Sequence, residues 1–209
     1  MTPEEFAAAA NVSRETFQRL KAMDAVLIDW CSRHNLIARS TIEERWRRHY
    51  LDSAQLVPLL PAGVKTLVDI GSGAGFPGLV LAAMLAEKDV YVTLIESTGK
   101  KAAFLAAAGE AMGLDNLKVI PARIEAAVLP SPPDIITARA LARLDKLLRY
   151  GHGIGGKNTR YFLLKGQDVA DELTQATKSW HMEVIPHGSV TDPGATILEI
   201  AKLKPAHDP

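Results

Sequence analysis

Apolar and polar residues follow a helical period along the first part of the chain. From Thr2 to about Pro61, apolar residues recur every three or four positions among charged ones, as expected of amphipathic helices. Asn11 or Ser13 can cap the first long helix, because such side chains satisfy the free N–H groups of a first helical turn. The pattern predicts an N-terminal helical extension over residues 1–60, packed on the rest of the protein.

The period changes after this extension. Residues 66–70 form a short apolar run that predicts a buried strand, and strand and helix patterns alternate after it. Such alternation is typical of βαβ units and a parallel sheet, so we predict an α/β domain over residues 61–209. The further strands are predicted at residues 91–96, 117–121, 133–138 and 160–165, and the helices at residues 79–86, 100–112 and 141–150.

The end of the chain has a different pattern. Residues 180–185 and 195–201 predict two strands joined through Pro186, Gly188 and the turn at residues 192–194, which indicates a closing antiparallel hairpin. Residues 151–157 are rich in glycine but follow a predicted helix and lack the pattern of a phosphate loop. We expect them to form a flexible connection near the substrate.

A glycine-rich turn follows the first predicted strand. Gly71, Gly73 and Gly75 lack the third glycine position of the dinucleotide pattern, which disfavours a pyrophosphate ligand. Asp69 would repel a pyrophosphate, but it suits a ligand with an ammonium group and a sulfonium. Glu96 ends the next strand, where an acid can accept hydrogen bonds from ribose hydroxyls. Together they favour S-adenosylmethionine as cofactor; the alternative is a structural glycine turn with two surface acids.

Composition narrows the class of protein. Twenty-four basic residues balance twenty-four acidic ones, so binding of nucleic acid requires a local basic patch. The single cysteine, Cys31, excludes an internal disulfide. The chain lacks an apolar run of roughly 18 residues and a basic leader, so we expect a cytoplasmic protein. We expect no metal site, because no metal-ligand spacing joins His34, His152, His181, His187 and His207.

The string DIGSGAGFPG, from Asp69 to Gly78, resembles the glucose-inhibited division protein B family, the guanine-N7 methyltransferases of small-subunit ribosomal RNA. The resemblance implies a Rossmann-like class I S-adenosylmethionine-dependent methyltransferase. Its mostly parallel seven-stranded sheet would carry a C-terminal antiparallel hairpin and an N-terminal helical extension. Further segments match in the family's order over nearly the whole chain: residues 35–36, 48–53, 93–97, 100–101, 137–142 and 164–166.

The resemblance also implies roles for site residues. Glu96 would hold the ribose, Ile124 and Glu125 would lie beside the adenine, and Arg139 would sit where cofactor and substrate meet. The target would be a guanine in the 530 loop of 16S ribosomal RNA, near the decoding site. The predicted cofactor-binding residues are Asp69, Gly71, Gly73, Phe76, Glu96, Ile124, Glu125 and Arg139.

Two basic side chains are candidates for catalysis. Arg139 can orient a phosphate or the O6 edge of a guanine, and Lys165 ends a predicted strand at the edge where open α/β sheets bind ligands. Guanine N7 carries a lone pair and no proton, so its methylation requires no catalytic base. The predicted RNA-binding residues, for which a solvated surface role is the alternative, are Asn35, Arg48, His49, Arg123 and Lys165.

The expected partner is 16S ribosomal RNA within the small ribosomal subunit or its assembly precursor. We expect a monomer without a membrane or DNA partner. Three alternatives stay open. One is an RNA-binding or ribosome assembly factor that kept the fold without turnover. Another is a methyltransferase for a small molecule, because fold does not determine the acceptor. The third, a nicotinamide-dependent oxidoreductase, is disfavoured by the glycine spacing and by Asp69.

Overall fold

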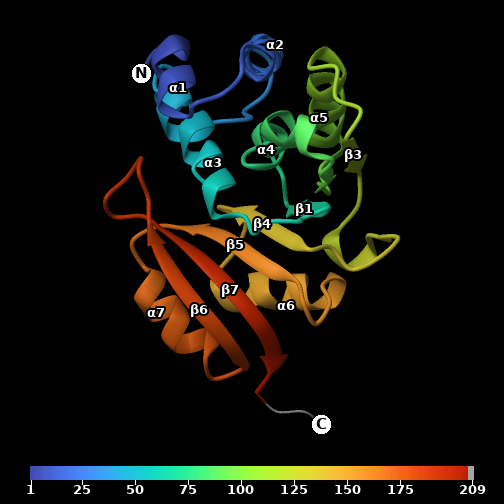
Figure 1. Ribbon diagram of the computed structural model, residues 1–209, viewed down its shortest axis with the longest axis vertical. Helices are drawn as coiled ribbons and strands as arrows, with labels where there is room; N and C mark the ends of the chain where they lie inside the picture. Colours follow the sequence, from blue (N-terminus) through green and yellow to red (C-terminus); the bar gives the residue numbers. More distant parts are fainter. Residues whose placement is uncertain (207–209) are drawn as a thin grey trace.

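One seven-stranded sheet organises the computed structural model, which describes residues 1–206 (Figure 1). Its strand order is β3-β2-β1-β4-β5-β7-β6; the first five strands are parallel, β7 pairs antiparallel with β5, and β6 pairs antiparallel with β7. The predicted α/β fold with a closing hairpin is confirmed. The strands are β1 (Thr66–Ile70), β2 (Tyr91–Ile95), β3 (Leu117–Ile120), β4 (Ile135–Arg139), β5 (Arg160–Lys165), β6 (Trp180–Gly188) and β7 (Thr196–Pro205).

Helices cover both faces of the sheet. In Figure 1, α4 and α5 lie on one face, α6 and α7 lie on the other, and the N-terminal helices stand outside α4 and α5. The π-helical segment Trp46–Leu51 leads into α3. The helices are α1 (Pro3–Ala9), α2 (Arg14–Cys31), α3 (Asp52–Ala54), α4 (Gly78–Leu85), α5 (Gly99–Ala111), α6 (Leu144–Ile154) and α7 (Val169–Ala176).

The N-terminal helices share a hydrophobic core with the sheet. Phe6, Trp46 and Tyr50 are buried in the same cluster as the apolar side chains of α4 and α5. The Trp46 and Tyr50 rings stack with their centroids 4.1 Å apart. Ser13 caps α2, because its side chain accepts a hydrogen bond from the Thr16 N–H. Since this core is continuous, we propose that residues 1–60 and the α/β domain fold as one unit.

The structure corrects two predictions in the second half of the chain and adds one helix. Pro186 and Gly188 belong to β6, opposite Leu198 and Thr196, and are not part of the turn. A proline is tolerated there because β6 is an edge strand. The helix predicted at residues 141–150 begins at Leu144 and ends at Ile154. Helix α7 was not predicted, because its eight residues offer a short apolar pattern.

The glycine-rich stretch at residues 151–157 is only in part a connection. Gly151 and Gly153 lie in the last turn of α6. Gly151 is packed so closely on β5 that a Cβ atom would lie 2.5 Å from Cε1 of Tyr161. Close helix–sheet packing therefore explains Gly151, and the prediction of a flexible connection is wrong for this residue.

Within residues 1–206, no helix is long and apolar enough to cross a membrane. The same part of the chain holds no group of three or more side chains placed to bind a metal ion. His207 and the last residues of the predicted α/β domain lie outside the described residues.

Candidate active site

The turn between β1 and α4 is held in a conformation that only glycine adopts without strain. Gly71, Gly73 and Gly75 have φ angles of 66°, 55° and 84°. The N–H groups of Gly71 and Ser72 donate to the carbonyl oxygen of Ile95, at 2.9 and 3.1 Å, which ties the turn to the end of β2. The turn is therefore a rigid loop at the carboxyl edge of the sheet, where open α/β sheets bind ligands.

A cavity of about 590 Å³ opens above this turn; we call it the loop cavity. Its volume lies within the roughly 300–1,000 Å³ of small-molecule sites. It brings together seven of the eight predicted cofactor-binding residues, and also Arg123 and His49. Those seven are Gly71, Gly73, Phe76, Glu96, Ile124, Glu125 and Arg139.

Glu96 closes one side of the loop cavity with a fixed carboxylate. Its Oε2 accepts a hydrogen bond from the Gly73 N–H at 2.9 Å, and its Oε1 accepts one from the Thr98 N–H at 2.7 Å. The residue is buried, so the carboxylate cannot swing into solvent. Each oxygen has further lone pairs, so it can also accept hydrogen bonds from hydroxyl groups of a ligand.

Asp69 is the predicted cofactor-binding residue that does not line the loop cavity. It lies beneath the turn, 1% exposed, and its Oδ1 accepts a hydrogen bond from the Thr137 hydroxyl at 2.8 Å. A Cβ atom at Gly78 would lie 2.8 Å from Oδ2 of Asp69. The structure therefore changes the role that we propose for Asp69 from direct ligand contact to support of the glycine turn.

Burial raises the pKa of Asp69 to about 6, although hydrogen bonds from Ser72 and Thr137 oppose the shift. The folded protein thus holds this proton at pH values where the unfolded chain has lost it. We expect stability from Asp69 to fall as the pH rises from about 4 to about 6 and to stay level above that. Denaturant unfolding of wild type and Asp69→Asn across this range tests the prediction: their difference in unfolding free energy should change in that window, and a constant difference contradicts it.

Arg139, at the end of β4, forms part of a stacked group with Phe76 and His49. Its guanidinium carbon lies 5.3 Å from the centroid of the Phe76 ring, and the His49 ring stacks on Phe76 at 5.1 Å. Nη1 of Arg139 donates to the Arg48 carbonyl oxygen at 3.0 Å and faces Oδ2 of Asp52 at 3.3 Å. Ala140 follows with a φ of 52°, an unfavourable angle for a residue with a Cβ atom.

His49 is a weak base in this environment. Burial, together with the charges of Arg139 and Arg48, lowers its pKa to about 4. Its Nε2 lies 3.0 Å from the hydroxyl oxygen of Thr41, whose own proton is donated to the Ala38 carbonyl oxygen. Nε2 of His49 therefore carries the proton, and the buried Nδ1 carries the lone pair. At neutral pH the imidazole is uncharged.

A second cavity, of about 640 Å³, adjoins the first; we call it the hairpin cavity, because the connection between β6 and β7 forms one wall. His49, Arg139 and Ala140 line both cavities. Arg48 and Lys165 line the hairpin cavity, as do Asp52, Gln55 and Thr191, which were not predicted as site residues. Ligands bound in the two cavities would therefore lie next to each other beside Arg139.

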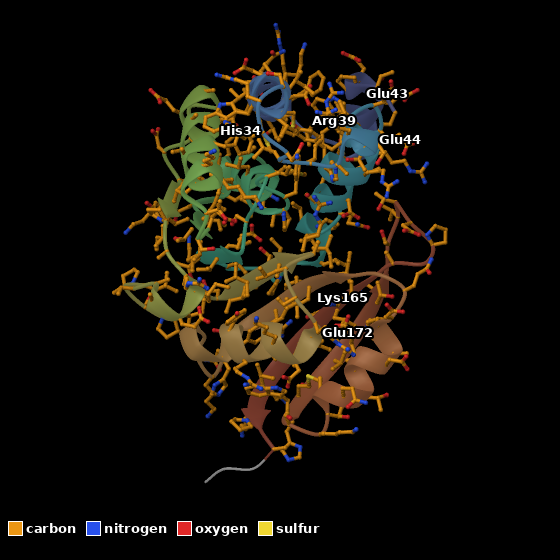
Figure 2. All side chains as sticks on the ribbon, turned by 180° about the vertical axis from the view of Figure 1, so that it is seen from behind. His34, Arg39, Glu43, Glu44, Lys165 and Glu172 are labelled. Atoms are coloured by element: carbon orange, nitrogen blue, oxygen red, sulfur yellow. The ribbon has the colours of Figure 1, made fainter. Side chains whose placement is uncertain are left out.

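Lys165 is already paired inside the hairpin cavity. Its Nζ lies 2.7 Å from Oε2 of Glu172, a residue of α7, and donates to the Ala142 carbonyl oxygen at 3.1 Å. Figure 2 shows the two labelled side chains meeting between β5 and α7. Their side chains are 10% and 13% exposed. The ammonium is therefore neutralised by the protein, and it holds the segment that follows Ala140.

The predicted RNA-binding residues do not all gather at one place. Arg48 and His49 reach the hairpin cavity and Arg123 reaches the loop cavity, whereas Asn35 lines neither. The side chain of Arg48 is 56% exposed. Asp52 lies inside the segment at residues 48–53 that matches the family, which was the available signal for it. Thr191 had no such signal, because it lies 139 positions further along the chain.

Comparisons with known proteins agree with this architecture. The chain is 45% identical over 204 residues to ribosomal RNA small subunit methyltransferase G of Rhodospirillum rubrum, covering 97% of this chain and 98% of the relative. It is 46% identical over 201 residues to the protein of the same description from Rhodospirillum centenum, covering 96% and 91%.

A solved structure shares the fold at low identity. A SAM-dependent methyltransferase from Aquifex aeolicus superposes with a TM-score of 0.57 at 17% identity, covering 78% of this chain and 98% of that one. This confirms the predicted Rossmann-like methyltransferase fold. The sequence profile of the GidB family, described as rRNA small subunit methyltransferase G, matches residues 16–199. With this match and with relatives of about 45% identity over nearly its full length, the chain belongs to the GidB family, as the loop string predicted.

Proposed function

We propose that this protein transfers a methyl group from S-adenosylmethionine to N7 of a guanine in 16S ribosomal RNA of the small subunit, within the 530 loop. The observation that carries the proposal is the wall shared by the two cavities. A donor in the loop cavity and a base in the hairpin cavity would be adjacent there, and methyl transfer requires such alignment of nucleophile, methyl carbon and leaving sulfur.

The residues that line the loop cavity suit this cofactor. Glu96 offers fixed carboxylate oxygens to the ribose hydroxyls, and Ile124 and Glu125 would lie beside the adenine. The glycine turn lets the ligand approach the backbone closely. When bound, S-adenosylmethionine supplies an activated methyl group on a positively charged sulfur.

The shared wall also fits an acceptor that carries no proton. His49 has a pKa of about 4 and Arg139 is a cation, so neither is a base of useful strength at neutral pH. Guanine N7 needs none: its lone pair forms the bond to the methyl carbon, and the electrons of the broken carbon–sulfur bond stay on sulfur. An acceptor such as an exocyclic amine has a proton to lose, and neither His49 nor Arg139 is suited to receive it.

Contacts to RNA are proposed for the exposed basic residues near the two cavities. Arg48 and Arg123 can reach phosphates, whereas Lys165 is paired with Glu172. We therefore propose that Lys165 positions the segment after Ala140 and does not itself bind RNA. Because the net charge of the chain is zero, bulk attraction to RNA is weak. Recognition then depends on folded RNA in an assembled or partly assembled subunit.

Replacement of Glu96 by alanine tests the donor site. Loss of the hydrogen bonds between a carboxylate and the ribose should weaken binding of S-adenosylmethionine at least tenfold, since hydrogen bonds to charged groups contribute about 1.5–3 kcal/mol. Calorimetric titration gives both dissociation constants. Glu125→Ala serves as a matched control on the same cavity, with a smaller expected loss. Unchanged affinity in Glu96→Ala contradicts the proposed donor site.

Transfer of a labelled methyl group tests the reaction itself. Purified protein is incubated with labelled S-adenosylmethionine and small subunits that lack the modification, and with a short RNA of the same target sequence. Borohydride followed by aniline cleaves RNA at N7-methylguanosine, so the label should lie at such a cleavage site, with faster transfer to subunits. Label at an uncleaved nucleotide contradicts the N7 assignment, and absence of transfer favours an assembly factor without turnover.

A further inference from the structure

The connection between β6 and β7 is tied to the N-terminal extension beside the hairpin cavity. In Figure 1 this connection, drawn in red, approaches α3. Oε1 of Gln55 accepts a hydrogen bond from the Val190 N–H at 2.8 Å, and its Nε2 lies 3.3 Å from the Ser189 hydroxyl. Nη2 of Arg47 donates to the Thr191 carbonyl oxygen at 3.2 Å. These contacts fix the connection against residues 47–55.

Asp52 stands between this connection and Arg139. Its Oδ1 accepts hydrogen bonds from the Thr191 hydroxyl at 2.7 Å and from Nε2 of Gln55 at 2.9 Å. Its Oδ2 faces Nη1 of Arg139 at 3.3 Å. The side chains of Asp52 and Arg139 are 16% and 19% exposed, so solvent screens this pair only in part. The carboxylate is held by neutral donors on one oxygen and presents the other to the guanidinium.

The remaining hydrogen-bond donors of Arg139 are free for a ligand. Both contacts that Arg139 makes to protein oxygens use Nη1, with the Arg48 carbonyl and with Asp52. Among residues 1–206, its Nε and Nη2 groups have no protein acceptor, and the side chain lines both cavities. A planar guanidinium that is fixed at one corner points its other donors in set directions.

We propose that Asp52 is a positioning residue for the methyl transfer: by holding Nη1, it directs the free donors of Arg139 toward the substrate at the shared wall. The inference rests on the proposed function. Asp52 would act through Arg139. Thr191 and Gln55, which donate to Asp52, would link the β6–β7 connection to the site. Without the carboxylate, the guanidinium loses one of its two anchors and the pairing of its charge.

A double-mutant cycle tests this role. Asp52→Asn should lower kcat/KM for small-subunit methylation about tenfold or more, as expected for loss of a hydrogen bond to a charged group. In an Arg139→Gln background, the same substitution should cause no further loss, because its effect runs through Arg139. An equal loss in both backgrounds, or full activity of Asp52→Asn, overturns the proposal.

Asp24→Asn provides the matched control for stability. Asp24 pairs with Arg45 through two contacts of 2.6 and 2.8 Å and lines neither cavity. It should lower the unfolding temperature at least as much as Asp52→Asn does, yet keep wild-type kcat/KM below that temperature. If Asp24→Asn lost as much activity as Asp52→Asn, general destabilisation would explain both results and the proposal would fail.

A readout without turnover separates this inference from the proposed function. Nitrogen-15 NMR of the Arg139 guanidinium, assigned through Arg139→Lys, reports rotation about the Nε–Cζ bond. Rotation should be at least tenfold faster in Asp52→Asn than in wild type. Equal rotation rates overturn the positioning role even if the protein methylates RNA. Faster rotation in a protein that transfers no methyl group supports Asp52 as the anchor of Arg139, and the proposed function alone fails.

Discussion

Replacement of Arg139 by alanine should lower kcat/KM for methylation of the small subunit by about 10²-fold or more, the scale of losing one placed hydrogen-bond donor in an active site. Arg139 lines both cavities, and among residues 1–206 its Nε and Nη2 groups have no protein acceptor. Initial rates with labelled donor and with subunit concentrations well below KM measure the effect. Turnover near that of wild type contradicts the role assigned to Arg139.

Arg139→Lys is the matched control for this prediction. Lysine keeps the positive charge and loses the planar fork, so it cannot hold Asp52 and the substrate in fixed directions at once. We expect an activity between those of wild type and Arg139→Ala. Full activity of Arg139→Lys would show that charge alone is sufficient and that the geometry of the guanidinium is not used.

Replacement of Gly75 by alanine should strongly destabilise the protein and abolish high-affinity donor binding. Its φ of 84° costs a residue with a Cβ atom about 1–2 kcal/mol. The new Cβ would also lie 2.4 Å from Cδ1 of Leu79, a fully buried side chain, and overpacking of this kind costs about 1–3 kcal/mol. Denaturant unfolding and calorimetric titration of S-adenosylmethionine measure the two effects.

Gly63→Ala isolates the contribution of backbone strain. Gly63 has a similar φ of 79°, but a Cβ atom there would meet nothing within 4 Å. It should therefore lose stability through strain alone and keep full donor affinity. If Gly75→Ala were no less stable than Gly63→Ala, the close packing of the glycine turn on α4 would not contribute as described.

The strands of the sheet could be predicted because burial on both faces leaves short apolar runs in the sequence. Strand β5 was predicted with its observed bounds, and β1 was located at the residues before the glycine turn. Pro186 marked a turn in the sequence, but an edge strand needs no hydrogen bond from that residue on its outer side. Whether a strand lies at the edge or in the middle of a sheet depends on the tertiary fold, so the local sequence around Pro186 does not reveal it.

Residues of the candidate site could be predicted where they directly follow a predicted strand. The glycine turn and Glu96 follow buried strands, and the structure brings them to one cavity. The position of Asp69 beneath the turn, outside the loop cavity, could not be foreseen, because it depends on Thr137 and on the close approach of Gly78. The neutralisation of Lys165 by Glu172 and the contact of Thr191 with Asp52 join separate segments, so only the folded chain reveals them.

Mass-spectrometric mapping of 16S ribosomal RNA from a strain without this protein tests the proposed methylation in the cell. We expect that one N7-methylguanosine, in the 530 loop, is lost, that the wild-type protein restores it, and that the Arg139→Ala variant restores little of it. Retention of every N7-methylguanosine in that strain, or loss of a methyl group from a different atom of a base, would contradict the proposed function.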